Sequence, residues 1–140
     1  MAMSMNLSDI GNMYGKLKSV YSIRVQCEDG PDMVVGVHLV FEKGEVFHEA
    51  LAEFDEISCS QTLSGEWQED ALIRVKVSHE APWISVVDRK VLWLWTMTNH
   101  QGYSDAILYS FANSVEDNEQ LIQLVTIASV VKVYGIERKL

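Results

Sequence analysis

Apolar and polar residues alternate with a period of two along much of the chain, which is typical of β-strands that bury one face. In segment 17–28 the apolar positions of this alternation are Tyr21, Ile23, Val25 and Cys27, and we expect these side chains to face a core. Similar patterns predict strands at 33–42, 45–54 and 106–112, one from 71 that ends before Pro82, and a short one near 57–60.

The second and third of these strands are predicted to pair as a hairpin. A two-residue loop, Lys43-Gly44, suits a tight turn because glycine adopts positive φ at little cost. In this register His38 lies opposite Glu49 on one face. The other face carries Val35, Val37, Leu39 and Phe41 together with Val46, His48, Ala50, Ala52 and Phe54. A loop longer by one residue would place His38 across from His48 instead. Helical spacing of apolar residues in the third strand leaves a helix as its alternative.

The strand predicted at 90–97 is the most apolar segment of the chain. One face carries Val91, Trp93, Trp95 and Met97, and the other carries Leu92, Leu94 and Thr96. Apolar residues on both faces are typical of a strand in the middle of a sheet, so we expect Trp93 and Trp95 to lie in the core.

The two ends of the chain carry the helical signals. Segment 6–14 begins with capping residues and predicts a short helix. Near the other end, a capping-box pattern at Ser114 favours a helix over 115–128. The density of β-branched residues favours instead two strands, at 120–127 and 130–137, and we adopt the strands.

These elements predict a mainly β protein, at the margin of the α+β class. Because long antiparallel strands twist strongly, we expect one antiparallel, strongly curled sheet or a partly open barrel, with a short N-terminal helix. No repeat, low-complexity tract or linker divides the sequence. Residues 1–140 should therefore form a single domain, in which 1–16 are an N-terminal helix or a flexible arm.

Composition limits the classes of function. The 140 residues are 48% apolar, and 20 acidic against 11 basic side chains give a net charge of −9. Charge of this sign repels phosphate backbones, so we expect no nucleic acid as partner and consider a basic protein. Residues 1–17 lack the apolar run of a signal peptide, and no apolar segment is long enough to span a membrane, so we expect no membrane as partner. With no Cys-x-x-Cys motif, the expectation is a cytoplasmic protein.

Motifs of common enzymes and metal sites are missing from the sequence. It has no phosphate-binding glycine loop, no Gly-x-Ser-x-Gly elbow and no closely spaced pair of metal ligands. We therefore expect no metal and no cofactor, and we interpret His48 as a core histidine held by backbone or carboxylate partners. For His38 we expect a cross-strand contact with Glu49.

Two groups of residues are candidates for binding. One strand of the hairpin presents a ladder of carboxylates with apolar side chains between them, formed by Glu45, Phe47, Glu49, Leu51 and Glu53. Such a face is either simply solvated or a docking surface for a basic partner, because solvation alone does not require aromatic anchors. Trp67 and Trp83 stand in polar surroundings and are candidates for an interface or a pocket.

Loop 99–105 is the candidate catalytic segment. It lies between two predicted strands, and His100, Tyr103 and Asp105 could relay protons there. The alternative is that the loop only forms a turn, since Asn and Asp side chains stabilise turns and Gly102 supplies positive φ.

This loop also carries a family resemblance. The residues from Trp93 to Phe111, centred on Asn99-His100-Gln101-Gly102-Tyr103-Ser104-Asp105-Ala106, resemble a pattern in a family of small bacterial proteins of unknown function. The resemblance covers 19 of the 140 residues. It implies a bacterial cytosolic protein and transfers no catalytic role, ligand or partner to any residue.

The sequence supports three hypotheses about function. The first is a small acidic protein-interaction or immunity-like module without catalytic activity. The second is a small enzyme or ligand-binding barrel with a pocket near loop 99–105. The third, compatible with either, is a homodimer formed through an exposed edge strand.

Overall fold

The structure is a computed structural model, which describes residues 7–51, 55–65, 67, 71–114, 116 and 118–137. These residues contain the short helix α1 (Leu7–Met13), the 3-10 helix η2 (Trp83–Ser85) and nine strands. The strands are β1 (Leu17–Val25), β2 (Met33–Phe41), β3 (Gly44–Leu51), β4 (Glu56–Ile57), β5 (Leu72–Lys76), β6 (Lys90–Thr98), β7 (Ser104–Ala112), β8 (Gln120–Ile127) and β9 (Val130–Glu137). No helix in this part of the chain combines the length and apolar content that crossing a bilayer requires.

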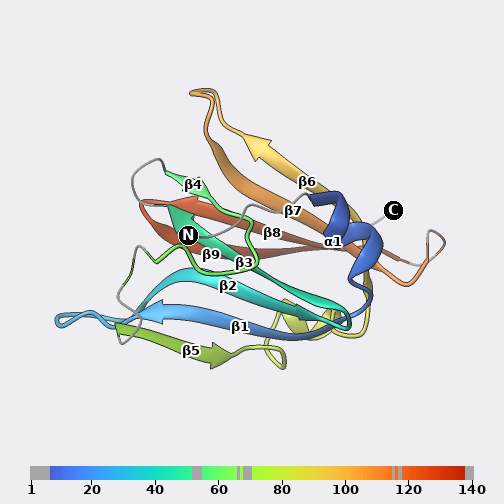
Figure 1. Cartoon of the computed structure of the whole chain (residues 1–140), viewed down its shortest axis with the longest axis horizontal. Helices are drawn as coiled ribbons and strands as arrows, with labels where there is room; N and C mark the ends of the chain where they lie inside the picture. Colours follow the sequence, from blue (N-terminus) through green and yellow to red (C-terminus); the bar gives the residue numbers. More distant parts are fainter. Residues whose placement is uncertain are drawn as a thin grey trace.

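The strands form two antiparallel sheets (Figure 1). One has the order β4-β3-β2-β1-β5, and the other has the order β6-β7-β8-β9. The mainly β class and the short N-terminal helix are confirmed. Instead of one curled sheet, however, the strands divide between two sheets, and no barrel closes. Splitting into packed sheets is the common outcome when many strongly twisted strands must bury one face.

The inner faces of the two sheets pack on each other and form the core. Val20, Leu39 and Val46 of the five-stranded sheet are fully buried, as are Tyr109 and Leu124 of the four-stranded sheet. Burial of an aliphatic or aromatic side chain of this size contributes roughly 1.5 to 3 kcal/mol. Apolar contact between the sheets is therefore the main source of stability.

In β1 the inward-facing set is the opposite of the predicted one. Val20 and Ser22 face the other sheet and lie opposite Leu39 and Val37 of β2, whereas Tyr21 lies on the outer face. Alternation defines the two faces of a strand but not which of them meets the second sheet. Ile23, which shares the outer face of β1 with Tyr21, is also buried, so apolar residues occur on both faces of this strand.

The chain ends in the hairpin of β8 and β9, which confirms the two strands predicted there. Ala128 and Ser129 connect them with φ values of 51° and 66°. Positive φ at both positions is what a two-residue type I′ turn requires. The helix considered for 115–128 is therefore wrong for 120–127, and residues 115 and 117 lie outside the described part.

The hairpin of β2 and β3 keeps the predicted faces but not the predicted register. Val37 and Leu39 share the inner face with Val46 and His48, and the helix considered for β3 is not formed. The loop is one residue earlier than expected, so His38 lies opposite Phe47 of β3.

In this hairpin Gly44 is required by a close contact with Tyr14 and does not form the turn. Gly44 lies within β3, and a Cβ atom there would be 2.8 Å from the ring of Tyr14. The loop residues Glu42 and Lys43 donate their backbone N–H groups to the carbonyl oxygens of Lys16, at 2.9 Å, and Tyr14, at 3.0 Å. These contacts with the segment before β1 fix the turn one residue early.

β6 is an edge strand with exposed tryptophans, so both expectations for it are wrong. Trp93 and Trp95 are 54% and 45% exposed. Val91 and Trp93 pair with consecutive residues of β7, which makes Leu92 the extra residue of a β-bulge. The bulge shifts the alternation by one position, so side chains that would have continued the inward face of Val91 point outward.

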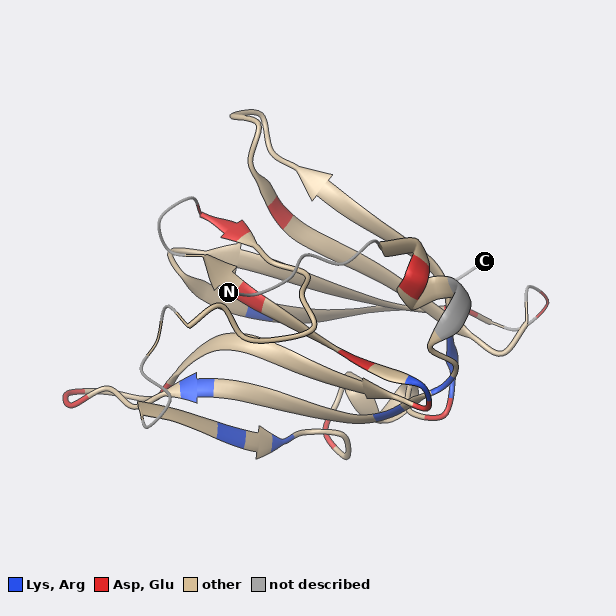
Figure 2. Ribbon diagram, viewed as in Figure 1, with Lys and Arg blue, Asp and Glu red and all other residues tan. Residues whose placement is uncertain are grey.

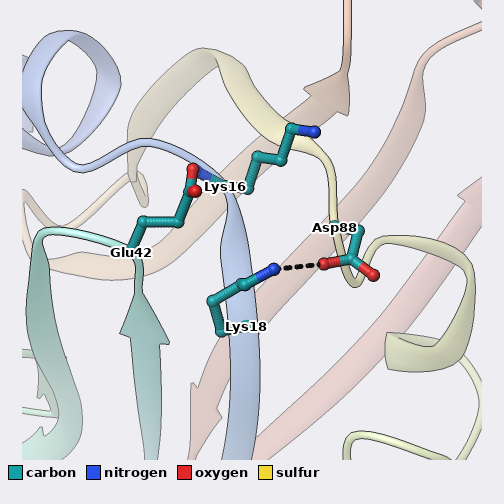
Figure 3. A network of polar contacts seen from close by, with 4 residues as sticks. All are labelled: Lys16, Lys18, Glu42 and Asp88. Atoms are coloured by element: carbon teal, nitrogen blue, oxygen red, sulfur yellow. Dashed lines mark hydrogen bonds and ion pairs between the residues drawn. The ribbon is translucent and has the colours of Figure 1, made fainter.

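A polar network links Asp88, in the segment between η2 and β6, to the start of β1 (Figure 3). Lys18 Nζ lies 2.7 Å from Asp88 Oδ1, and this hydrogen bond lowers the pKa of Asp88 and raises that of Lys18. Beside it, the backbone N–H of Lys16 donates to Glu42 at 2.7 Å, and Asp88 N–H donates to the Leu17 carbonyl at 2.8 Å. Because the ion pair is exposed, it contributes little to stability, and the backbone contacts hold the segment.

Candidate functional site

A pocket of about 450 Å³ opens on the outer face of the five-stranded sheet, and we name it the Trp67 pocket. Its volume is within the range of pockets that bind ligands or side chains of a partner. The lining residues are Glu45, Phe47, Glu49, Gln61, Thr62, Leu63, Gly65, Trp67 and Leu72. Four residues predicted to bind, Glu45, Phe47, Glu49 and Trp67, therefore surround one cavity.

β3 places three of these side chains together. Glu45, Phe47 and Glu49 point to the outer face because Val46 and His48, between them, are buried in the core. The shared face predicted from the sequence is thus the wall of the pocket.

The segment after β4 folds back over this wall. Ser60 and Phe47 exchange both backbone hydrogen bonds, at 2.7 and 3.0 Å, and Ser58 N–H donates to the Glu49 carbonyl at 2.8 Å. The segment is thereby held against β3, and Leu63 and Trp67, which follow it, complete the lining of the cavity.

Glu49 lines the pocket from a covered position and is 2% exposed. One carboxylate oxygen accepts the backbone N–H of Ser64 at 2.9 Å, and the other accepts the Ser64 hydroxyl at 2.8 Å. Both carboxylate oxygens are therefore satisfied within the chain. The expected ladder of solvated carboxylates is wrong at this position, because the segment 58–65 covers the strand.

Glu45 stands at the rim, with 53% of its side chain exposed. It accepts a hydrogen bond from His38 Nε2 at 3.1 Å, where the sequence had suggested Glu49 as the partner of His38. Burial lowers the pKa of His38, although the bond to Glu45 opposes this shift. The imidazole is therefore neutral at pH 7, and the negative charge of Glu45 stays uncompensated by it.

A column of stacked side chains crosses the outer face and ends in the pocket. The guanidinium of Arg74 lies 4.1 Å from the ring centre of Tyr21, whose ring is 5.7 Å from that of His38. His38 stacks on Phe47 with ring centres 4.0 Å apart and planes 9° from parallel. This column holds the Phe47 ring beside the carboxylates, and an aromatic ring next to negative charge is an arrangement that binds cations.

The remaining residues predicted to bind lie elsewhere. Trp83, in η2, is 3% exposed and belongs to the core, and Leu51 is a half-buried residue at the end of β3. Glu53 lies outside the described residues. The sequence analysis missed Leu63 and Leu72 as pocket residues, and the one available signal was an apolar leucine within a polar segment.

Loop 99–103 forms the tip of the β6-β7 hairpin, which projects from the molecule (Figure 1). Asn99 Oδ1 accepts the backbone N–H groups of the residues two and four positions later, at 2.9 and 3.2 Å, and its amide donates to Asp105 at 3.2 Å. Gly102 has a φ of 90°. The side chains of this loop thus form a turn, and His100 and Tyr103 are exposed and do not line the Trp67 pocket.

The remaining histidine and cysteine side chains form no metal site in the described part of the chain. Within the described residues, no three His, Cys, Asp or Glu side chains are grouped so that they could hold a metal ion. Cys27 and Cys59 are free thiols, and burial raises the pKa of Cys59 to about 11. His48 is a core histidine with a backbone partner, as predicted.

Comparison with known proteins identifies a family whose function is unknown. Residues 1–139 match the model of a family of unknown function. The match extends the resemblance seen between Trp93 and Phe111 to nearly the whole chain. No curated protein and no solved structure matches the chain.

Proposed function

The chain belongs to DUF6334, a family of unknown function, and from its own geometry we propose that it is a protein-interaction module that binds a basic segment of a partner protein in the Trp67 pocket. A cationic side chain of the partner enters between Phe47 and Trp67, with its charge near Glu45 and Glu49. The combination of aromatic rings and carboxylates around one cavity is the observation that carries this proposal.

Charge favours a cationic partner. The chain carries a net charge of −9, which accelerates the approach of basic proteins. Figure 2 shows the acidic positions of β3 on the ribbon. Glu45 is half exposed, and its hydrogen-bond partner His38 is neutral, so a positive charge at the rim meets an unneutralised carboxylate.

The apolar part of the lining favours a long side chain with an aliphatic stem. Leu63 and Leu72 stand in the same cavity as Phe47 and Trp67. Arginine and lysine bury their methylene stems against apolar surface while the charged head meets polar groups. Aromatic anchors of this kind dominate the energy of many protein interfaces.

Calorimetric titration with two short peptides tests the proposal. The probes are acetyl-Leu-Arg-Leu-amide and the same peptide with citrulline, a neutral isostere, in place of arginine. We expect the arginine peptide to bind about tenfold more tightly, because only it makes the cation–π and charge-assisted contacts. Its affinity should fall as salt is added, since salt screens the exposed carboxylate.

Two matched variants locate the effect. Glu45→Gln removes the rim charge and should abolish most of the preference for arginine over citrulline. Glu80→Gln removes the same charge from an exposed position that does not line the pocket, and it should keep the preference. Equal binding of the two peptides by the unmodified protein, or an equal loss in both variants, would contradict the proposal.

A further inference from the structure

The outer face of the four-stranded sheet is apolar and uncovered. Eight large apolar side chains of the described residues are exposed, and six of them belong to this sheet face: Trp93, Trp95, Met97, Ile127, Tyr134 and Ile136. Pairing places them on one face, because directly opposed residues of antiparallel strands share a face. Trp95 of β6 is linked to Tyr134 of β9 by Leu108 and Gln123 of the two strands between them. Trp93 is linked to Ile136 in the same way by Ser110 and Leu121.

A contiguous apolar surface of this kind requires an explanation, whereas scattered exposed residues do not. The inward neighbours Leu94 and Val133 already pack against the core. The outward set is therefore additional to what the fold needs for its own stability.

Charged groups are few on the same face. Beyond the β6 bulge, Lys132 is the one charged side chain that pairing places outward in the four described strands. From the residue before β8, the Glu119 carboxylate also reaches this face, where it accepts a hydrogen bond from the Ser110 hydroxyl. Figure 2 accordingly shows few coloured positions on β6 to β9. Elsewhere the chain carries a net negative charge, so two copies repel each other when they approach through most other surfaces.

The size of the face is appropriate for a modest protein interface. Four strands spaced ~4.8 Å apart give the sheet a width of about 19 Å, and about seven residues per strand at ~3.3 Å each give a length of about 23 Å. The face therefore has a projected area of roughly 450 Å². The protruding tryptophan and tyrosine side chains add accessible area to this projection. Two such faces together approach the ~1,200 Å² at the lower end of stable interfaces.

We propose that a second copy of this chain occupies the outer face, so that the two four-stranded sheets pack against each other around a two-fold axis. A two-fold axis brings the same patch of both copies together, which suits a face whose large exposed side chains are apolar. Sheets stack face to face at a separation of about 10 Å with interdigitating side chains. An anionic membrane is a poorer occupant because the chain itself is acidic.

Sedimentation equilibrium from micromolar to millimolar concentration tests this proposal. We expect the mass to rise from that of the 15.9 kDa chain to twice that value, with a dissociation constant in the micromolar range. Trp95→Glu should weaken the dimer at least about a hundredfold, because the two-fold axis would bury two unpaired carboxylates. A mass that stays monomeric over the whole range would overturn the proposal.

Ile84→Glu is the matched control. Ile84 is 60% exposed, more than any of the six apolar residues of the outer face, but lies in η2 outside the sheet. This variant should dimerise like the unmodified protein. Tyr134→Glu, on the strand at the other edge of the face, should dissociate the dimer as Trp95→Glu does, and circular dichroism verifies that each variant is folded.

The variants also separate face packing from pairing of edge strands. A dimer that survives both Trp95→Glu and Tyr134→Glu would be held by the edge of β6 or another strand, and this outcome would refute the face interface. Loss of the dimer in Ile84→Glu to the same degree would refute it as well, because the effect would then follow from added charge alone.

Discussion

The hydroxyl of Tyr109 is hydrogen-bonded to Nε2 of His48, and this bond joins the two sheets inside the core. The other ring nitrogen of His48, Nδ1, lies 2.9 Å from the carbonyl oxygen of Ser58, which can only accept. Nδ1 therefore carries the proton of the neutral imidazole, and Nε2 accepts the proton of Tyr109. Both side chains are fully buried, so neither has water as an alternative partner.

Tyr109→Phe should destabilise the protein. The variant keeps the ring, which stacks on Phe111 with centres 5.3 Å apart, but leaves Nε2 of His48 buried without a donor. We expect a loss of about 1 to 3 kcal/mol in the free energy of unfolding, measured by urea denaturation. Tyr103→Phe, at the exposed tip of the β6-β7 hairpin, is the control and should change stability by less than about 0.5 kcal/mol.

His48 should make stability depend on pH in the mildly acidic range. Burial lowers its pKa from the ordinary 6.5 to about 4. Above 6.5 the histidine is neutral in both states, whereas between 6.5 and 4 the unfolded chain takes up the proton first. Stability therefore falls as the pH falls through this window, by roughly 3 kcal/mol in total.

Comparing a His48 variant with the unmodified protein separates the contribution of His48 to the pH dependence of stability from that of other titrating groups. His48→Gln should be less stable at pH 7, and its free energy of unfolding should fall less steeply between pH 6.5 and 4. His100→Gln removes an exposed histidine and should leave the slope of the unmodified protein unchanged. If His48→Gln retained that slope, the buried histidine would not be its source.

Gly44→Ala tests the contact that sets the register of the β2-β3 hairpin. The added Cβ would lie 2.8 Å from the Tyr14 ring, so the ring or the strand must shift, at a cost of roughly 1 to 3 kcal/mol. Gly11→Ala is the matched change within α1, where no atom lies within 4 Å of the new Cβ. It should stabilise the helix by up to about 1 kcal/mol. Thermal unfolding that lowered both variants equally would argue against the specific contact.

The two cysteines should differ in reactivity. Burial raises the pKa of the Cys59 thiol to about 11, so at about pH 8 roughly one molecule in a thousand carries the reactive thiolate. Cys27 lines a shallow surface cavity after β1. Iodoacetamide labelling followed by peptide mass spectrometry should modify Cys27 first, and Cys27→Ser should remove the fast phase. Equal rates at both positions would contradict the assigned burial of Cys59.

The strands could be predicted wherever local chemistry was sufficient. Alternation and β-branched residues identified most of them, and the turn at Ala128 and Ser129 was located correctly. The hairpin register failed because it depends on Tyr14, a residue far from Gly44 in sequence. The prediction for β6 was wrong because one extra residue, Leu92, reverses which side chains of the later positions point inward and which point outward.

The part of the candidate site that lies on β3 could be predicted from the sequence, and the rest could not. Period-two spacing placed Glu45, Phe47 and Glu49 together on one face of a strand, and they are together in the pocket wall. The burial of Glu49 was not predictable, because it depends on where the following segment folds and on its bonds to Ser64. No periodicity indicates that Trp67 lines the same pocket.

The outward direction of Trp93 and Trp95 makes the protein's ultraviolet emission a measure of its surroundings. Trp83 is buried, whereas these two side chains are about half exposed, so they should emit at longer wavelength and be accessible to quenching by dissolved iodide. Whatever covers the outer face would shift this emission to shorter wavelength and shield it from the quencher. The chain thus contains its own optical reporter, and no attached dye is needed to observe this surface becoming covered.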